Sequence, residues 1–308
     1  MKRPSILGAA AIAVALAAIA GCGANPPDTA AASGGQTLAV VATTPEVADF
    51  VREIGGTAVA VTQLIKPNVD PHEYEPTPAD LRAIGSARVV VKNGARLEEW
   101  LDATIEAAGF GGAIVDAGQG VTLREGEDGP DPHIWHDPRN AKIMVAGIER
   151  ALAAAEPAGA ATFRANLGRY TAELDELDAE NEAAFARLPA RNRKLVTDHD
   201  AFGYYVARYG LEFVGSVIPS LDTSAELSGR QLTDLVAKIR ATGTKAVFTE
   251  SSLPPKTAAA IARQAGVAVV AGEDALFGDS LGAPGTPEGT YLGAERHNTR
   301  VIVAALAG

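Results

Sequence analysis

Residues 158–188 read AGAATFRANLGRYTAELDELDAENEAAFARL and predict one long helix in the middle of the chain. Apolar side chains recur in this run at intervals of three and four residues, at Phe163, Leu167, Tyr170, Leu174 and Leu177. That spacing gathers them on one face of a helix, which then packs against other elements. No strict heptad continues over three or four repeats, so the pattern favours a rigid connecting helix over a coiled coil.

Short β-rich runs alternate with helical patterns on both sides of this helix. Before it, we expect strands at 38–43, 58–65, 87–92 and 113–116, and helices at 45–55, from 78, at 97–108 and at 138–155. After it, we expect strands at 194–197, 211–218, 246–249 and 267–270, and helices at 201–209, 228–242, 254–266 and 291–306. Strands and helices in this order are typical of parallel sheets covered by helices.

The predicted fold is therefore α/β, with two lobes of parallel sheet flanked by helices and joined by one long rigid helix. The expected bounds are 37–157 for the N-terminal lobe, 158–188 for the connecting helix and 189–308 for the C-terminal lobe. Two helix starts are marked by capping residues, Thr77 before Pro78 and Ser228, and Gly243 marks a helix end.

The N-terminus predicts a lipoprotein. Lys2 and Arg3 precede an apolar run over 6–20, which ends in small residues and Cys22. This arrangement indicates a signal peptide over 1–21, and it resembles a bacterial lipobox in which Cys22 is lipidated. An ordinary signal peptide with an incidental cysteine is the alternative. Residues 22–36 then form a flexible tether, rich in Ala, Gly, Pro and Ser, and hold the protein on the outer face of a membrane.

Composition limits the function classes. The formal net charge of −11 argues against nucleic-acid binding, which needs a basic surface. Cys22 is the only cysteine, so the folded part has no disulfide and no thiolate metal ligand. No later stretch is apolar enough to predict a transmembrane helix.

Three of the five histidines follow predicted strands. His72 lies in the loop after the second strand, His133 in the loop after the fourth, and His199 at the end of the first strand of the second half. Ligands of open parallel sheets bind outside the carboxyl ends of the strands. We therefore expect the three imidazoles to share a site in a cleft. Residues 131–138 (DPHIWHDP) contain two prolines, which restrict the backbone, so we expect this segment to be a stiff support for His133.

A fourth ligand is expected from an equivalent position near the last predicted strand. Asp279 follows that strand among glycines, but an ordinary Asx turn explains it equally well from the residues alone. Glu273 and Asp274 are rival carboxylates nearby.

The chain resembles the solute-binding lipoproteins of bacterial zinc and manganese ABC transporters. The resemblance covers nearly all of the chain after the tether and is carried by DPHEYEPTPADL (70–81), VKNGARLEEWL (91–101), DPHIWHDP (131–138), VTDHDAFGYYVARYGL (196–211) and GTYLGAERHN (289–298). It implies one metal ion between two lobes. It also implies His72 and His133 as ligands from the first lobe, and His199 and Asp279 from the second.

Four other residues need an interpretation beside this ligand set. His136 departs from the family pattern, which usually has an apolar residue there, and we expect it to face solvent. His297 lies in the last predicted helix, where we expect a structural role. Glu250 and Asp200 are candidates to orient a metal-binding imidazole, although either could be a solvated loop charge.

Three imidazoles and one carboxylate suit tetrahedral Zn²⁺, whereas Mn²⁺ prefers more oxygen ligands. Manganese-binding relatives tend to have Glu at the position of His199, which also favours zinc. The histidine-rich loop of several zinc importers is absent, since residues 118–130 are acidic without histidine. Manganese therefore stays an alternative.

The resemblance implies a protein that captures metal outside the membrane and delivers it to an ABC permease with its ATPase. The oligomeric state is open, and a monomer is the default expectation for such a shuttle. A zinc hydrolase is the competing class, but it usually leaves one zinc position open to water. The sequence has no HExxH, GxSxG or GxxxxGK[ST] motif. A third possible function is that of a surface adhesin, and no feature of the sequence distinguishes adhesion from transport.

Overall fold

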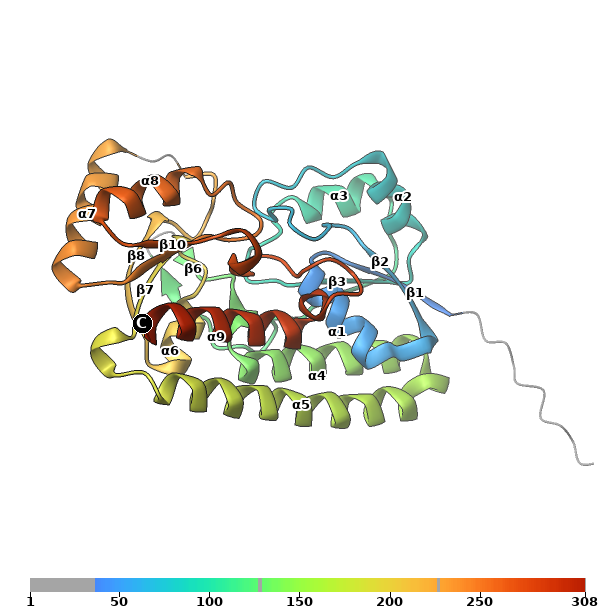
Figure 1. Ribbon diagram of the computed structural model, residues 1–308. Helices are drawn as coiled ribbons and strands as arrows, with labels where there is room; N and C mark the ends of the chain where they lie inside the picture. Colours follow the sequence, from blue (N-terminus) through green and yellow to red (C-terminus); the bar gives the residue numbers. More distant parts are fainter. Residues whose placement is uncertain (1–36, 127–128, 226–227, 308) are drawn as a thin grey trace, which may run out of the picture. The chain divides into compact units, whose positions relative to one another are not determined.

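The computed structural model describes residues 37–126, 129–225 and 228–307, and the residues from Thr37 onward form one compact unit (Figure 1). The predicted signal peptide, the lipidation site Cys22 and the tether lie outside the described residues. None of the helices described is long and apolar enough to cross a membrane.

The first half of the chain builds a four-stranded parallel sheet in the order β2-β1-β3-β4. Its strands are β1 (Leu38–Ala42), β2 (Val59–Gln63), β3 (Val89–Lys92) and β4 (Ala113–Asp116). Its helices are α1 (Pro45–Gly55), α2 (Pro78–Ser86), α3 (Leu101–Ala107) and α4 (Pro138–Ala155). A short hairpin, β5 (Glu125–Gly126) with β6 (Gly129–Pro130), and the 3-10 helix η2 (Ile134–His136) precede α4. The predicted parallel sheet is confirmed.

The second half contains two parallel strand pairs, and β7 also packs beside β9. The strands are β7 (Lys194–His199), β8 (Glu212–Ile218), β9 (Ala246–Phe248) and β10 (Ala268–Val270). The helices are α6 (Gly203–Tyr209), α7 (Gly229–Thr242), α8 (Lys256–Ala265) and α9 (Tyr291–Ala307). Short 3-10 helices include η5 (Gly272–Asp274) and η6 (Pro287–Gly289).

The predicted long helix is α5 (Ala160–Ala186), which runs along both groups of strands in Figure 1. It packs against α1 and α4 of the first half and against α6 and α9 of the second. The apolar stripe faces these partners, since Phe163, Tyr170, Leu174 and Leu177 are buried. The lobe boundaries at 157 and 189 stay a prediction.

Local sequence explains most element ends. Thr77 caps α2, as predicted, and forms a reciprocal capping box with Asp80. Gly243 ends α7 in the left-handed conformation. The helix expected from residue 97 begins only at Leu101, however. Residues 94–96 all have positive φ, so the backbone turns before a helix can form.

Asp49 on α1 provides a test of how burial affects stability. Its carboxylate is buried and accepts the backbone N–H of Tyr291 at 2.9 Å. Burial raises the pKa of Asp49 to about 6. A carboxyl whose pKa is raised by folding stabilises the fold below its unfolded pKa of about 4 and loses that contribution as pH rises through its folded value.

Asp49→Asn should therefore gain stability relative to the wild type as pH rises. The difference in unfolding free energy between variant and wild type should shift by about 2 kcal/mol in favour of the variant between pH 4 and pH 8. Chemical denaturation of both metal-free proteins measures this shift. A difference that stays constant over that range would contradict the prediction.

Candidate metal centre

Four predicted ligands come together from four separate segments. His72 lies in the loop after β2, His133 directly precedes η2, His199 ends β7 and Asp279 follows η5. One ligand atom from each lies within 4.8 Å of the ligand atoms of the other three. His133, His199 and Asp279 are buried, while His72 is partly exposed. Four segments that are far apart in the sequence thus bring three imidazoles and one carboxylate to one point.

The spacing of these ligand atoms suits a single small cation. The Nε2 atom of His133 lies 3.3 Å from Nε2 of His72 and 3.3 Å from Nε2 of His199. Asp279 Oδ2 lies 3.3 Å from Nε2 of His72 and 3.1 Å from Nε2 of His199, and its Oδ1 lies 3.4 Å from Nε2 of His133. Ligands about 2.0–2.1 Å from a tetrahedral ion are about 3.3–3.4 Å apart. These five pairs therefore have close to tetrahedral spacing.

Two carboxylates orient the buried imidazoles. Asp131 Oδ1 lies 2.8 Å from Nδ1 of His133, and Glu250 Oε1 lies 3.0 Å from Nδ1 of His199. A carboxylate at Nδ1 favours the tautomer that keeps its proton there, so the lone pair of Nε2 points to the other ligands. The same carboxylates accept the backbone N–H of His133 and of His199, each at 3.0 Å.

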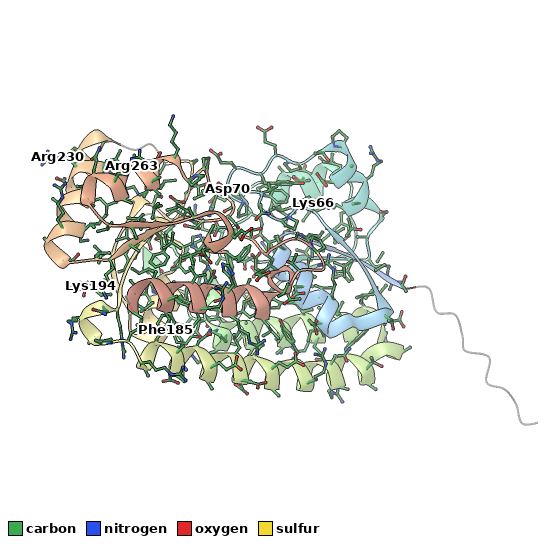
Figure 2. All side chains as sticks on the ribbon, in the orientation of Figure 1. Lys66, Asp70, Phe185, Lys194, Arg230 and Arg263 are labelled. Atoms are coloured by element: carbon green, nitrogen blue, oxygen red, sulfur yellow. The ribbon has the colours of Figure 1, made fainter. Side chains whose placement is uncertain are left out.

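Asp70 fixes the loop that carries His72, and in Figure 2 its labelled side chain lies between the two groups of strands. Asp70 Oδ1 accepts the backbone N–H of His72 at 2.9 Å, and its Oδ2 accepts the hydroxyl of Thr223 at 2.6 Å. The N–H of Asn68 in the same loop donates to Oγ of Ser280 at 2.6 Å. The loop is thus bonded to the second half of the chain at two residues that precede His72.

Charge is balanced inside the cluster. Burial alone would raise the pKa of Asp279, but the imidazoles of His199 and His133 hold that pKa well below its usual range. Burial opposes a charge on His199, yet the carboxylates of Asp279 and Glu250 raise its pKa well above the usual value. A cation that binds here must therefore displace protons from imidazole.

Comparison with known proteins identifies the family. The model of the family described as zinc-uptake complex component A, periplasmic, matches residues 40–305. The chain belongs to this family. Relatives include the manganese-binding lipoprotein MntA of Bacillus subtilis, 35% identical over 96% of this chain and 98% of MntA. The zinc-binding protein TroA of Treponema pallidum is 36% identical over 90% of this chain and 91% of TroA.

Comparison with solved structures finds a protein with the same fold. The solved structure of periplasmic zinc-binding protein TroA from Treponema pallidum matches with a TM-score of 0.84 and 32% identity, over 89% of this chain and 100% of that chain. Both the predicted family and the predicted α/β fold with a long helix are thereby confirmed.

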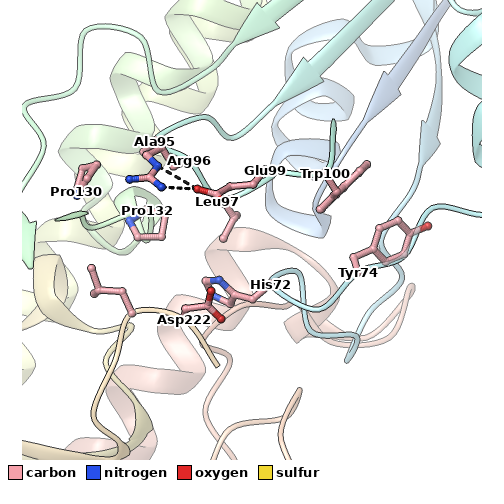
Figure 3. Close-up of a pocket in the computed structure, with 11 residues that line it drawn as sticks. His72, Tyr74, Ala95, Arg96, Leu97, Glu99, Trp100, Pro130, Pro132 and Asp222 are labelled. Atoms are coloured by element: carbon pink, nitrogen blue, oxygen red, sulfur yellow. Dashed lines mark hydrogen bonds and ion pairs between the residues drawn. The ribbon is translucent and has the colours of Figure 1, made fainter. Parts of the chain in front are cut away.

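In this member of the zinc-uptake family, a pocket of about 280 Å³ opens beside His72 (Figure 3). Tyr74 and Trp100 line it on one side, and Asp222 lies near the imidazole of His72 on the other. Because the other three ligands are buried, the pocket makes His72 the ligand closest to solvent.

His136 does not face solvent, so that prediction is wrong. Its side chain is fully buried, its Nδ1 lies 2.8 Å from Glu295 Oε1, and its ring stacks on Phe202. The expectation failed because its partner Glu295 comes from α9, more than 150 residues away in the sequence. His136 also lies outside the group of four ligands.

The structure gives the other candidate residues different contacts. Asp200 donates its backbone N–H to Ser220, and its carboxylate forms no hydrogen bond to an imidazole among the described residues. Glu250, in contrast, contacts His199 directly. His297 lies 3.0 Å through Nε2 from the carbonyl of Ala275, which is a structural contact. The rival carboxylates Glu273 and Asp274 are exposed in η5.

Sequence reasoning missed Asp131 and Asp70 as supports. Both belong to Asp-Pro-His triplets, and in each triplet the aspartate accepts the backbone N–H of the histidine two residues later. This is the bonding of an Asx turn. The repeated triplet was therefore a signal for two histidines held in the same local geometry.

Proposed function

We propose that this chain captures Zn²⁺ outside the cell membrane and delivers it to an ABC permease that works with an ATPase. The observation that supports this most directly is the convergence of His72, His133, His199 and Asp279 on one point. In this proposal the four side chains bind the metal as cargo, and Asp131 and Glu250 orient two of the imidazoles.

Zinc is favoured by the ligand set and its spacing. Three imidazoles and one carboxylate are typical zinc ligands, and the spacing of about 3.1–3.4 Å fits tetrahedral coordination. Four protein ligands fill a tetrahedral site and leave no open position for a reactive water. We therefore propose binding and release without catalysis.

Manganese is the second candidate because both oxygens of Asp279 face imidazoles. A carboxylate that binds through both oxygens would add a fifth ligand, and Mn²⁺ prefers oxygen-rich coordination. The manganese-binding name of the relative MntA supports the same alternative.

We also propose that a lipid anchors the protein to the membrane and that its two lobes move only modestly when metal binds. Lipidation at Cys22 would hold a monomer at the outer face of the membrane, on a tether of residues 23–36, close to its permease. Metal in the cluster would connect segments from both halves of the chain. The two hydrogen bonds between the His72 loop and the second half are consistent with modest lobe movement on binding.

Metal competition tests this function. The full chain is purified in detergent, stripped of metal and offered limiting Zn²⁺ and Mn²⁺ together near neutral pH, and bound atoms are counted by mass spectrometry. We expect one zinc per chain with manganese excluded, because the ligand set is nitrogen-rich.

Comparable occupancy by manganese would replace the zinc assignment with the five-ligand alternative. A chain that binds neither ion would contradict the proposed function. Turnover of an ester or peptide that is lost in His133→Ala would instead support a hydrolase.

A further inference from the structure

A second buried polar cluster lies one aromatic ring away from the ligands. It consists of His136 in η2 with its partner Glu295 on α9, and of Glu46 in the first turn of α1, whose charge interacts with that of His136; we call it the Glu-His-Glu cluster. All three residues are at most 2% exposed. The indole of Trp135 separates it from the ligands, since its ring centroid is 5.5 Å from that of His133 and 5.4 Å from that of His136.

Most polar atoms of this cluster lack a partner. His136 Nδ1 lies 2.8 Å from Glu295 Oε1. Among the described residues, no hydrogen-bond partner exists for Nε2 of His136, for Oε2 of Glu295 or for either carboxylate oxygen of Glu46. Buried groups without partners cost stability. Their presence points to a role other than support of the fold.

The cluster contains two carboxylates and only one group that can carry a positive charge. If His136 and Glu295 form an ion pair, the carboxylate of Glu46 has no cation of its own. An unpaired charge in the interior is costly, so such a group takes up a proton instead. Burial raises the pKa of Glu46 to about 7, and the negative charge of Asp279 contributes to the rise. The raised pKa favours a proton on Glu46 near neutral pH in the metal-free protein.

The surroundings keep the pair of His136 and Glu295 charged. Burial opposes a charge on His136, but Glu295 outweighs it and raises the pKa of His136. The ionisable groups that face the cluster from other described elements are Asp279, Asp137, Tyr205, Tyr209 and Tyr291. Burial raises the pKa of all three tyrosines well above its usual value, so they stay neutral. The two aspartates add negative charge, which favours a proton on the cluster.

We propose that the Glu-His-Glu cluster is a proton-exchange site coupled to metal capture, with Glu46 as the group that carries the proton. This inference rests on the proposed function, because it requires a divalent cation at the four ligands. The cation brings two positive charges beside Asp279 in exchange for the protons that it displaces from the imidazoles, and a net gain of positive charge there disfavours protonated Glu46. The O–H bond of Glu46 then breaks, its proton leaves to solvent, and its carboxylate stays as a counter-charge to the metal.

The consequence is one additional proton in the binding equilibrium. Protons leave the imidazole ligands when metal binds. The Glu-His-Glu cluster adds the proton of Glu46 to the number of protons released per metal ion. Metal capture then depends more steeply on pH than four ligands alone require. Acidification favours release, because Glu46 takes its proton back when the metal leaves.

Calorimetry counts these protons. Zinc is titrated into the metal-free full chain in detergent at pH 6.5, in several buffers that differ in ionisation enthalpy, and the dependence of the heat on the buffer gives the protons released. We expect the wild type to release up to about one proton more per zinc than Glu46→Gln. Glu149→Gln is the matched control, since Glu149 is a buried carboxylate on α4 outside the cluster, and it should behave as the wild type.

A second measurement needs no variant. The infrared difference spectrum between the metal-free and the zinc-bound wild type should show the loss of a protonated carboxyl band. Equal proton release by wild type and Glu46→Gln, or no loss of that band, would overturn this inference alone if one zinc still binds per chain. A wild type that binds neither zinc nor manganese would overturn the proposed function and this inference with it.

Discussion

Asp279→Ala should weaken zinc binding by more than about a hundredfold. Zinc sites with four ligands bind with about 10–16 kcal/mol, so the average contribution is about 3 kcal/mol per ligand, which exceeds two factors of ten in affinity. Asp279 is also the only anion among the four ligands, and its two oxygens face all three imidazoles. Its removal leaves three neutral ligands in a buried site, where an unbalanced double charge is costly.

The control for this variant is Asp274→Ala. Asp274 lies five residues earlier, is exposed and belongs to η5. It is not one of the four proposed ligands. Competition with a chelating dye measures both affinities. An Asp274 variant that loses as much affinity as the Asp279 variant, or an Asp279 variant that binds zinc normally, would contradict the assigned ligand set.

The convergence of the three candidate histidine ligands could be predicted from local pattern. Each follows a β-rich run, and the carboxyl ends of parallel strands gather at one edge of a sheet. Asp279 differs because the segment between η5 and η6 contains no helix or strand, only an isolated β-bridge between Leu276 and Glu250. Its place depends on contacts such as the hydrogen bond from Trp135 Nε1 to the carbonyl of Gly278. Only the resemblance to known motifs distinguished it from an ordinary turn.

The pairing of His136 with Glu295 could not be predicted because it depends on how α9 packs. In the sequence, Glu295 is followed by Arg296 in a polar stretch that gives no sign of burial. Packing of α9 against α5 turns Glu295 inward, while Arg296 pairs with Glu180 on the exposed side. A histidine after an aromatic residue has no local feature that indicates burial. The whole Glu-His-Glu cluster is thus a property of the tertiary structure.

Glu250→Gln should weaken zinc binding by about 10–100-fold, the usual cost of removing a group that orients a metal ligand. Glu250 lies 3.0 Å from Nδ1 of His199, and its side chain is fully buried. Glutamine keeps the size but removes the negative charge, so His199 becomes a weaker base and loses its preferred tautomer.

Asp200→Asn is the matched control, because Asp200 follows His199 directly and carries the same charge without bonding to an imidazole. Its zinc affinity should equal that of the wild type. If electrostatic attraction alone held the metal, the two variants would lose affinity to a similar extent. A loss confined to Glu250→Gln would show that the direction of the His199 lone pair matters as well as the summed charge. Equal losses in the two variants would leave Glu250 without an orienting role.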